Sequence, residues 1–252
     1  MKDFLYSIII TFSFFTIIPL PMVNWTSKRM RFLPLLMPFV GLGIGLLGYG
    51  IYSLLINLAV SEFSSAVAMV LFYLVITGGL HMDGLMDTAD AYFSRQTKEK
   101  KMEIMKDSRV GAFAVMALVC LLLIKISLFY EIFRAGGGTG ILLIMIPILS
   151  RTVQALMLCH FPFAKEDGLA VMYSQATGQK TSLLLTIYFV LTSGIIYLLF
   201  NMTALLLPLG LLTFTVYYYF SVKKNFGGIT GDIVGTYVEL AEVLMLGLLL
   251  VL

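Results

Sequence analysis

The sequence predicts an all-α fold, a polytopic bundle of about eight transmembrane helices that forms a single domain over residues 1–252. Of these 252 residues, 60% are hydrophobic and 12% are charged, whereas soluble domains are about half apolar and a quarter charged. Apolar runs of about 20 residues, the length that a bilayer requires, recur along the chain. The net charge of +3 is too small to suggest nucleic-acid binding. The composition therefore predicts a protein of the lipid bilayer.

The apolar runs give the predicted spans in chain order. The first, residues 4–20, ends in the sequence IIPLP without a small-residue cleavage site, so we interpret it as a retained span rather than a signal peptide. The second, residues 33–57, contains five glycines, which let helix backbones approach closely in lipid. Such packing can occur within one subunit or between two, so a homo-oligomer stays open. The remaining predicted spans cover residues 63–80, 110–130, 139–160, 182–200, 203–220 and 233–252.

The basic residues give an internal test of this count, because Lys and Arg collect on the cytoplasmic side of membrane proteins. With eight spans, the loops on one face hold 13 of the 17 basic residues, and the opposite face holds Lys2 and Arg134. The other two, Lys125 and Arg151, lie within predicted spans. We therefore expect a multi-pass protein of a prokaryotic inner membrane, with its polar loops in the cytoplasm and both termini outside.

One long polar segment interrupts the apolar sequence, a predicted cytoplasmic loop region at about residues 81–109. It contains Asp83, Asp87 and Asp90, and this spacing places three carboxylates on one face of a helix. Like charges this close repel one another unless a cation joins them. Oxygen ligands without His or Cys suit Mg²⁺, which shares its coordination shell with water and substrate phosphates. The alternative is that these are solvated acids balanced by neighbouring lysines.

A second polar constellation precedes the last predicted span. Gly228, Thr230 and Gly231 form a predicted turn before Asp232. The free N–H groups at the start of the following helix can hold a phosphate. The alternative is an ordinary helix start that Asp232 caps.

Two acids, Glu239 and Glu242, continue into the last predicted span. A carboxylate in that position is costly and is usually paired or functional, so both are candidate metal ligands. Arg151 is a candidate partner for them and a candidate substrate-binding group. Lys125 lies near the outer end of its predicted span and is expected to reach the surface without a function.

These motifs resemble those of the cobalamin synthase family, also called adenosylcobinamide-GDP ribazoletransferase. The resemblance lies in GGLHMDGLMDTADA at 78–91, EIMKDSRVGAFA at 103–114 and GGITGDIVGTYVELAE at 227–242. The IIPLP sequence, FAKEDGLA at 163–170 and the overall length support it. Two details depart from the pattern, because Lys165 stands where we expect an arginine and AYFSRQTKEKK lacks a glycine-rich continuation. The segment 161–179 either closes over a substrate or simply connects two spans.

The resemblance implies a Mg²⁺-dependent transfer that assembles a nucleotide loop. A ribose hydroxyl of α-ribazole, or of its 5′-phosphate, would attack adenosylcobinamide-GDP, so that GMP leaves and adenosylcobalamin or its phosphate forms. Such chemistry requires mainly positioning and charge neutralisation. We expect the metal on Asp83, Asp87 and Asp90, with Asp107 or Asp232 completing its shell, and one of the acids, Asp107 included, as acceptor of the hydroxyl proton. The expected phosphate contacts are Lys106, Arg109 and the turn from Gly228 to Gly231.

Two other classes of protein share parts of this pattern. CDP-alcohol phosphotransferases carry DGxxAR followed by GxxxDxxxD; here Asp83 and Gly84 match, but Asp87 and Thr88 stand where Ala and Arg belong. An ion-coupled transporter would also carry acids within its spans. It would, however, place polar residues near the bilayer midplane in several spans, whereas most charge here lies in predicted cytoplasmic loops.

Overall fold

The computed structural model describes residues 2–136, 138–164 and 178–252, and the regular elements within them are all helices. This confirms the all-α prediction. The elements in chain order are α1 (Lys2–Phe15), α2 (Ser27–Met30), α3 (Leu33–Asn57), α4 (Glu62–Ile76), α5 (Leu80–Phe93), α6 (Lys98–Ile104), α7 (Ala112–Ala135), η1 (Gly138–Ile141), α8 (Leu142–His160), α10 (Gln179–Phe200), η2 (Met202–Leu205), α11 (Leu206–Phe226) and α12 (Gly231–Leu249).

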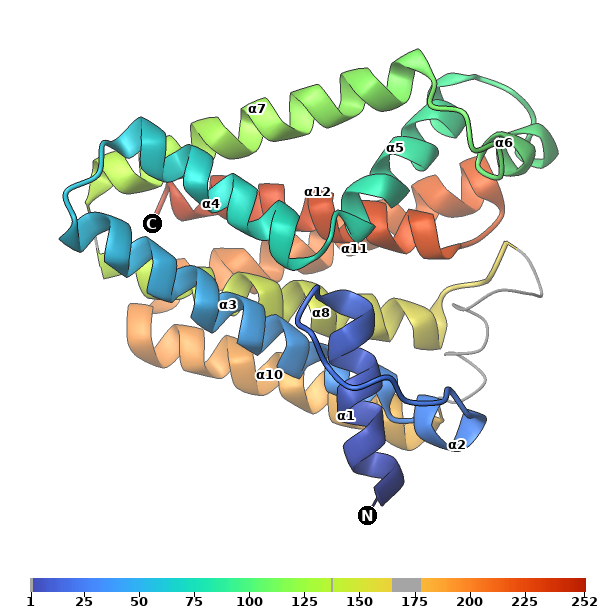
Figure 1. Ribbon diagram of the computed structural model, residues 1–252, viewed down its shortest axis with the longest axis horizontal. Helices are drawn as coiled ribbons and strands as arrows, with labels where there is room; N and C mark the ends of the chain where they lie inside the picture. Colours follow the sequence, from blue (N-terminus) through green and yellow to red (C-terminus); the bar gives the residue numbers. More distant parts are fainter. Residues whose placement is uncertain (1, 137, 165–177) are drawn as a thin grey trace.

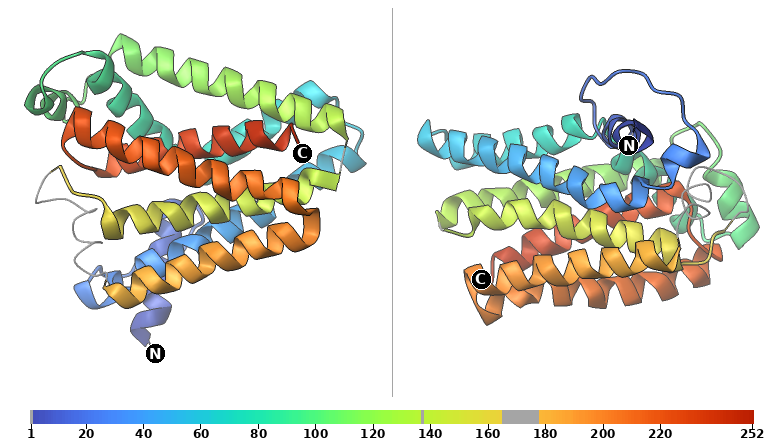
Figure 2. Two further views of the ribbon diagram at one scale, coloured as in Figure 1. Left: turned by 180° about the vertical axis from the view of Figure 1, so that it is seen from behind. Right: turned by 90° about the horizontal axis from the view of Figure 1, so that it is seen from below.

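The long helices run roughly side by side and form one bundle (Figures 1 and 2). Among the described residues, five stretches are long and apolar enough to cross a membrane, namely α3, α7, α8, α10 and the stretch Met202–Phe226. With 19 residues, α12 also has the length of a span, but it carries three acids. The chain is therefore a multi-pass membrane protein, with fewer apolar spans than the eight predicted.

The first predicted span is wrong, because α1 lies across the bundle rather than along it (Figures 1 and 2). Its 14 residues extend only about 21 Å. The chain then turns back, so that Arg29 pairs with Asp3 at 3.2 Å and Ser7 donates to the Arg29 carbonyl at 2.7 Å. The start of α1 thus lies beside α2, which contradicts our expectation that Lys2 and Arg29 face opposite sides of the membrane.

The predicted third span is broken between α4 and α5, which meet at an angle of 90°. Gly78 and Gly79 adopt φ values of 61° and 73°, a left-handed conformation that glycine enters without steric cost. Together the two helices pass the test for one broken span or a re-entrant loop. The bend turns α5 away from α4 and against α12, at the end of the bundle that carries α6 (Figure 1).

The glycine-rich helix α3 packs within the subunit, against α8. A Cβ atom on Gly45 would lie 2.6 Å from the Ile144 carbonyl oxygen, and one on Gly41 would lie 2.7 Å from the Pro147 carbonyl carbon. Both distances are too short for any side chain, so these glycines let two helix backbones touch. These two glycines therefore serve the fold of one chain.

Candidate active site

The N-terminal half of α5 is held directly against the start of α12. A Cβ atom on Gly84 would lie 2.8 Å from the Asp232 Cα atom, so glycine is required for this approach. The Thr236 hydroxyl donates to the Gly84 carbonyl at 3.0 Å and fixes the two helices in register. The contact brings Asp232 beside the α5 segment that carries Asp83 and Asp87, although about 150 residues separate them in the sequence.

The charges of these acids act on one another. Asp83 is exposed, whereas Asp87 and Asp232 are half-buried. Partial burial, followed by the charges of Asp83, Asp232 and Asp90, raises the pKa of Asp87 to about 6. Asp87 thus lies near Asp232, and these acids leave a concentration of negative charge at this end of the bundle.

Asp90 has a different environment from its neighbours on the same helix. Its carboxylate accepts backbone N–H bonds from Gly111 at 2.7 Å and from Ala114 at 2.9 Å. These groups open α7, whose N-terminal N–H groups have no partners within the helix. Asp90 therefore caps α7 from another helix, a structural contact that the sequence spacing did not predict.

No three His, Cys, Asp or Glu side chains within the described ranges are grouped closely enough to form a ready-made metal site. This arrangement still fits Mg²⁺, which commonly takes only one or two carboxylates and completes its shell with water and substrate phosphates. Oxygen donors on Asp83, Asp87 and Asp232 have the right chemistry. Partial burial, followed by the charges of the neighbouring acids, raises the pKa of Asp87. The acids of α5 and Asp232 are thus the residues suited to a hard cation.

Glu239 and Glu242, which we predicted as metal ligands, are instead ion-paired in the core. Glu239 pairs with Lys125, and Glu242 pairs with Arg151 and lies 3.9 Å from the Lys125 ammonium. All four side chains are at most 5% exposed. Two cations thus balance two anions among α7, α8 and α12, and the paired carboxylates need no metal.

Lys125 and Arg151 correct two further expectations. We expected Lys125 to reach the surface, but α7 extends to Ala135, so Lys125 lies mid-helix and is only 2% exposed. Arg151 is the predicted partner of Glu242, and it also donates to the Ser150 hydroxyl at 2.8 Å. Its burial rules out the substrate contact that we also considered for it. The missed signal was a lysine in the middle of a long apolar run.

The glycine turn before α12 packs against the end of α8. Ile229 donates to the Pro162 carbonyl at 2.8 Å, and Ala164 donates to the Ile229 carbonyl at 3.0 Å. Gly228 is buried there, whereas Gly231 is exposed at the first position of α12. The Thr230 hydroxyl caps the helix by accepting the Ile233 N–H at 3.3 Å, whereas the alternative that we considered for this turn had Asp232 as the cap. Most of segment 161–179, which either closes over a substrate or connects two spans, lies outside the described part of the chain, at residues 165–177.

The predicted phosphate-binding residues after α6 are exposed to solvent. Lys106 and Arg109 are both exposed, and Arg109 pairs with Asp107 at 2.6 Å. Hydrogen bonds from Arg109 hold the pKa of Asp107 down at about 2. A carboxyl with so low a pKa is a poor proton acceptor, which favours Asp87 over Asp107 for that role.

Comparisons with known proteins give matches over nearly the whole chain. A family model described as "Cobalamin-5-phosphate synthase" matches residues 7–250. An adenosylcobinamide-GDP ribazoletransferase of Clostridium perfringens strain SM101 is 35% identical over 99% of this chain and 100% of its own length. A protein of the same name from Brevibacillus brevis is 36% identical over 98% of this chain and 96% of its own. No solved structure matches.

Proposed function

The chain belongs to the cobalamin-5-phosphate synthase family, and from this premise we propose that it acts as an adenosylcobinamide-GDP ribazoletransferase. The family that the three motifs resemble is the family that the comparisons identify, and the match covers nearly the whole chain. The main structural support is that the α5 acids lie close to Asp232 at one end of a membrane bundle.

The reaction proposed is a phosphoryl transfer between two soluble substrates. A ribose hydroxyl of α-ribazole, or of its 5′-phosphate, attacks the phosphorus that bears the cobinamide. A new P–O bond forms, the P–O–P bond to the GMP moiety breaks, and the hydroxyl proton passes to a base. Asp87 suits this last task, because a pKa of about 6 lies close enough to neutral pH for both accepting and releasing a proton.

We assign the acids next to Asp87 to a Mg²⁺ ion. Asp83 and Asp232 would hold it, and when bound it would supply neutralisation of the diphosphate charge. This extends beyond the family assignment and rests on the oxygen-only donor set and on the closeness of these acids to one another, which contributes to the raised pKa of Asp87. The exposed Gly231 at the start of α12 and the exposed bases Lys106 and Arg109 are suited to phosphate oxygens.

We place the site at the cytoplasmic face of the membrane. Helices α2 and α6, the start of α10 and the end of α11 carry eight of the 17 basic residues and lie toward one end of the bundle (Figure 1). Basic residues favour the cytoplasmic side, and the acids of α5 lie toward the same end. Ion pairing accounts for Glu239 and Glu242, so no described contact favours ion transport.

The decisive experiment is a turnover assay of the purified protein with adenosylcobinamide-GDP, α-ribazole and Mg²⁺. We expect GMP and the joined corrinoid, identified by mass, only when both substrates are present. Replacing Asp83 with alanine should abolish GMP release, and replacing the exposed Glu103 with alanine provides a matched acid control. Undiminished turnover by a folded Asp83→Ala variant would remove Asp83 from the mechanism, and failure of the parent protein would overturn the function.

A further inference from the structure

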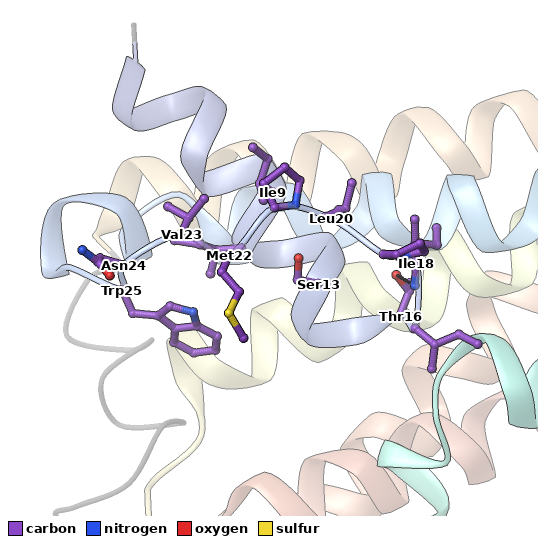
Figure 3. A pocket seen from close by; sticks show the side chains of 13 residues that line it. Ile9, Ser13, Thr16, Ile18, Leu20, Met22, Val23, Asn24 and Trp25 are labelled. Atoms are coloured by element: carbon purple, nitrogen blue, oxygen red, sulfur yellow. Dashed lines mark hydrogen bonds between the residues drawn. The ribbon is translucent and has the colours of Figure 1, made fainter.

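The segment that follows α1 encloses a cavity to which the reaction above assigns no role. Residues 16–26 return along α1 and enclose about 620 Å³ with it. Figure 3 shows the cavity, which extends between Thr16 at one end and Trp25 at the other. This volume lies in the range of small-molecule sites. Its lining residues are Ile9, Ile10, Ser13 and Thr16 to Trp25.

One end of this cavity adjoins the bend that positions the acids. The Ile17 N–H donates to the carbonyl of Ile76 at 2.9 Å, and Ile76 is the last residue of α4. A Cβ atom on Gly78 would lie 3.0 Å from the Ile17 side chain. Helix α5 begins two residues later, and Asp83 follows within its first turn. One end of a molecule bound in the cavity would therefore lie beside the start of α5, the helix that carries the acids.

The lining of the cavity selects the kind of molecule that fits. Most of the lining is aliphatic, and Trp25, the single tryptophan of the sequence, is 44% exposed at the far end. Met22 is fully exposed, and Figure 3 shows Met22 and Trp25 on the same side of the segment. A partly exposed indole offers a flat face for stacking, and an adjacent thioether adapts to an aromatic ring.

Two of the polar groups at the cavity already have partners. The Thr16 hydroxyl donates to the Phe12 carbonyl at 2.6 Å, and the Asn24 carbonyl accepts from Arg29 at 2.8 Å. Guanine carries more donors and acceptors than the base of α-ribazole and would give up more water on entering a mostly aliphatic lining, which costs binding energy. A fused aromatic base with methyl groups and a single free ring nitrogen, as in α-ribazole, would lose much less.

We infer that this cavity binds the aromatic base of α-ribazole, stacked on Trp25, with the ribose directed along residues 16–18 toward α5. The inference rests on the proposed function for the identity of the nucleoside. It adds a binding site for the attacking substrate, formed by α1 and residues 16–26 and separate from the acids that face the diphosphate. The orientation of α1 across the bundle then forms a substrate site, because a helix α1 that spanned the membrane would not enclose this space.

The single tryptophan allows a direct test that does not depend on turnover. Titrating α-ribazole into the full-length protein in detergent, without adenosylcobinamide-GDP, should quench the Trp25 emission in a saturable manner, whereas GMP should leave it unchanged. Quenching by GMP and not by α-ribazole would overturn the inference, as would a change caused by added phospholipid alone. An absence of quenching in a protein that turns over normally would overturn it too, while leaving the proposed function intact.

Kinetics of substituted proteins give the second test. Trp25→Ala should raise the KM for α-ribazole about tenfold, the size expected for a lost base–aromatic stacking contact, and leave the KM for adenosylcobinamide-GDP unchanged. Trp25→Phe should restore most of the affinity. Tyr217→Ala is the matched control, since Tyr217 lines another cavity, among α5, α7, α11 and α12. Equal effects of Trp25→Ala on both KM values, or an equal effect of Tyr217→Ala on the KM for α-ribazole, would contradict a specific site.

Discussion

Helix α12 carries acids in two contrasting environments. At its start, Asp232 lies beside Asp83 and Asp87, and partial burial together with the charges of the neighbouring acids raises the pKa of Asp87 to about 6. Two to three turns further on, Glu239 and Glu242 are buried against Lys125 and Arg151. The first group keeps its negative charge at an accessible surface, and the second has its charge cancelled inside the bundle.

The difference teaches how to separate functional acids from structural ones in a membrane protein. An acid inside a span is costly, which makes it conspicuous in a sequence. The cost is met here by cations from α7 and α8, so Glu239 and Glu242 serve to hold three helices together. Clustered acids at the end of the bundle are the better indication of a functional site. Their mutual repulsion is relieved when a cationic ligand binds.

The largest expected effect comes from breaking one buried pair. Glu242→Gln leaves the Arg151 guanidinium without its counter-charge in the core, and we expect the unfolding free energy to fall by about 3–5 kcal/mol. Titration with a denaturing detergent, followed by circular dichroism, measures this change. Adding Arg151→Met to Glu242→Gln should recover most of the loss, since the second substitution removes the uncompensated charge.

The same substitution tests whether Glu242 binds metal. In the fraction that stays folded, the Mg²⁺ concentration for half-maximal turnover should equal that of the parent protein. A stable Glu242→Gln protein with a raised Mg²⁺ requirement would reverse the contrast between the two ends of α12, because it would assign Glu242 to the site and not to the core.

A smaller loss of stability is expected at Asp90, where α5 meets the start of α7. Asp90→Ala leaves the N–H groups of Gly111 and Ala114 without their carboxylate, and loss of such a cap costs about 1–2 kcal/mol. Asp90→Asn should cost less, because its amide oxygen can still accept a bond. Denaturant titration gives the free energies, and faster hydrogen exchange at Ala114 locates the effect. Lost turnover with unchanged stability in both variants would instead assign Asp90 to the metal.

The sequence predicted much of this architecture, and its failures have physical causes. Hydropathy located the long helices, and helical spacing placed Asp83 and Asp87 on one face. Hydropathy could not distinguish a spanning helix from α1, because an apolar run reads the same whether it lies along the bundle or across it. The pairing of Lys125 with Glu239 joins residues 114 positions apart, and no local pattern encodes it. Nor did spacing reveal that Asp90 caps α7, since that bond depends on how α6 returns the chain.

The next prediction concerns the pH dependence that Asp87 confers. Its folded-state pKa of about 6 exceeds the ordinary value of 3.8, so the folded protein binds more protons than the unfolded chain between these values. Stability should therefore rise as the pH falls from about 6 to 4. Thermal unfolding across this range measures the slope, and Asp87→Asn should flatten it. Because Asp83 and Asp232 keep their carboxylates, added Mg²⁺ should raise the melting temperature of the parent protein and of Asp87→Asn alike; a shift in the parent protein alone would place Asp87 in the metal site.

The smallest effect is expected at Asp107, where an exposed cation already compensates the acid. Arg109 holds the pKa of Asp107 near 2, so any stability that Asp107 contributes is complete above its unfolded pKa and is lost only as the pH falls toward 2. Asp107→Asn should therefore lower the melting temperature at neutral pH only slightly, because an exposed ion pair contributes little, and should leave the pH dependence of the melting temperature unchanged there. The turnover of this variant should still rise through pH 6 as Asp87 ionises, whereas Asp87→Asn should lack that rise. A pH–rate profile of each variant compares them directly. If Asp107→Asn loses the rise and Asp87→Asn keeps it, the base lies on the exposed loop, and raised pKa is the wrong criterion for finding it in this protein.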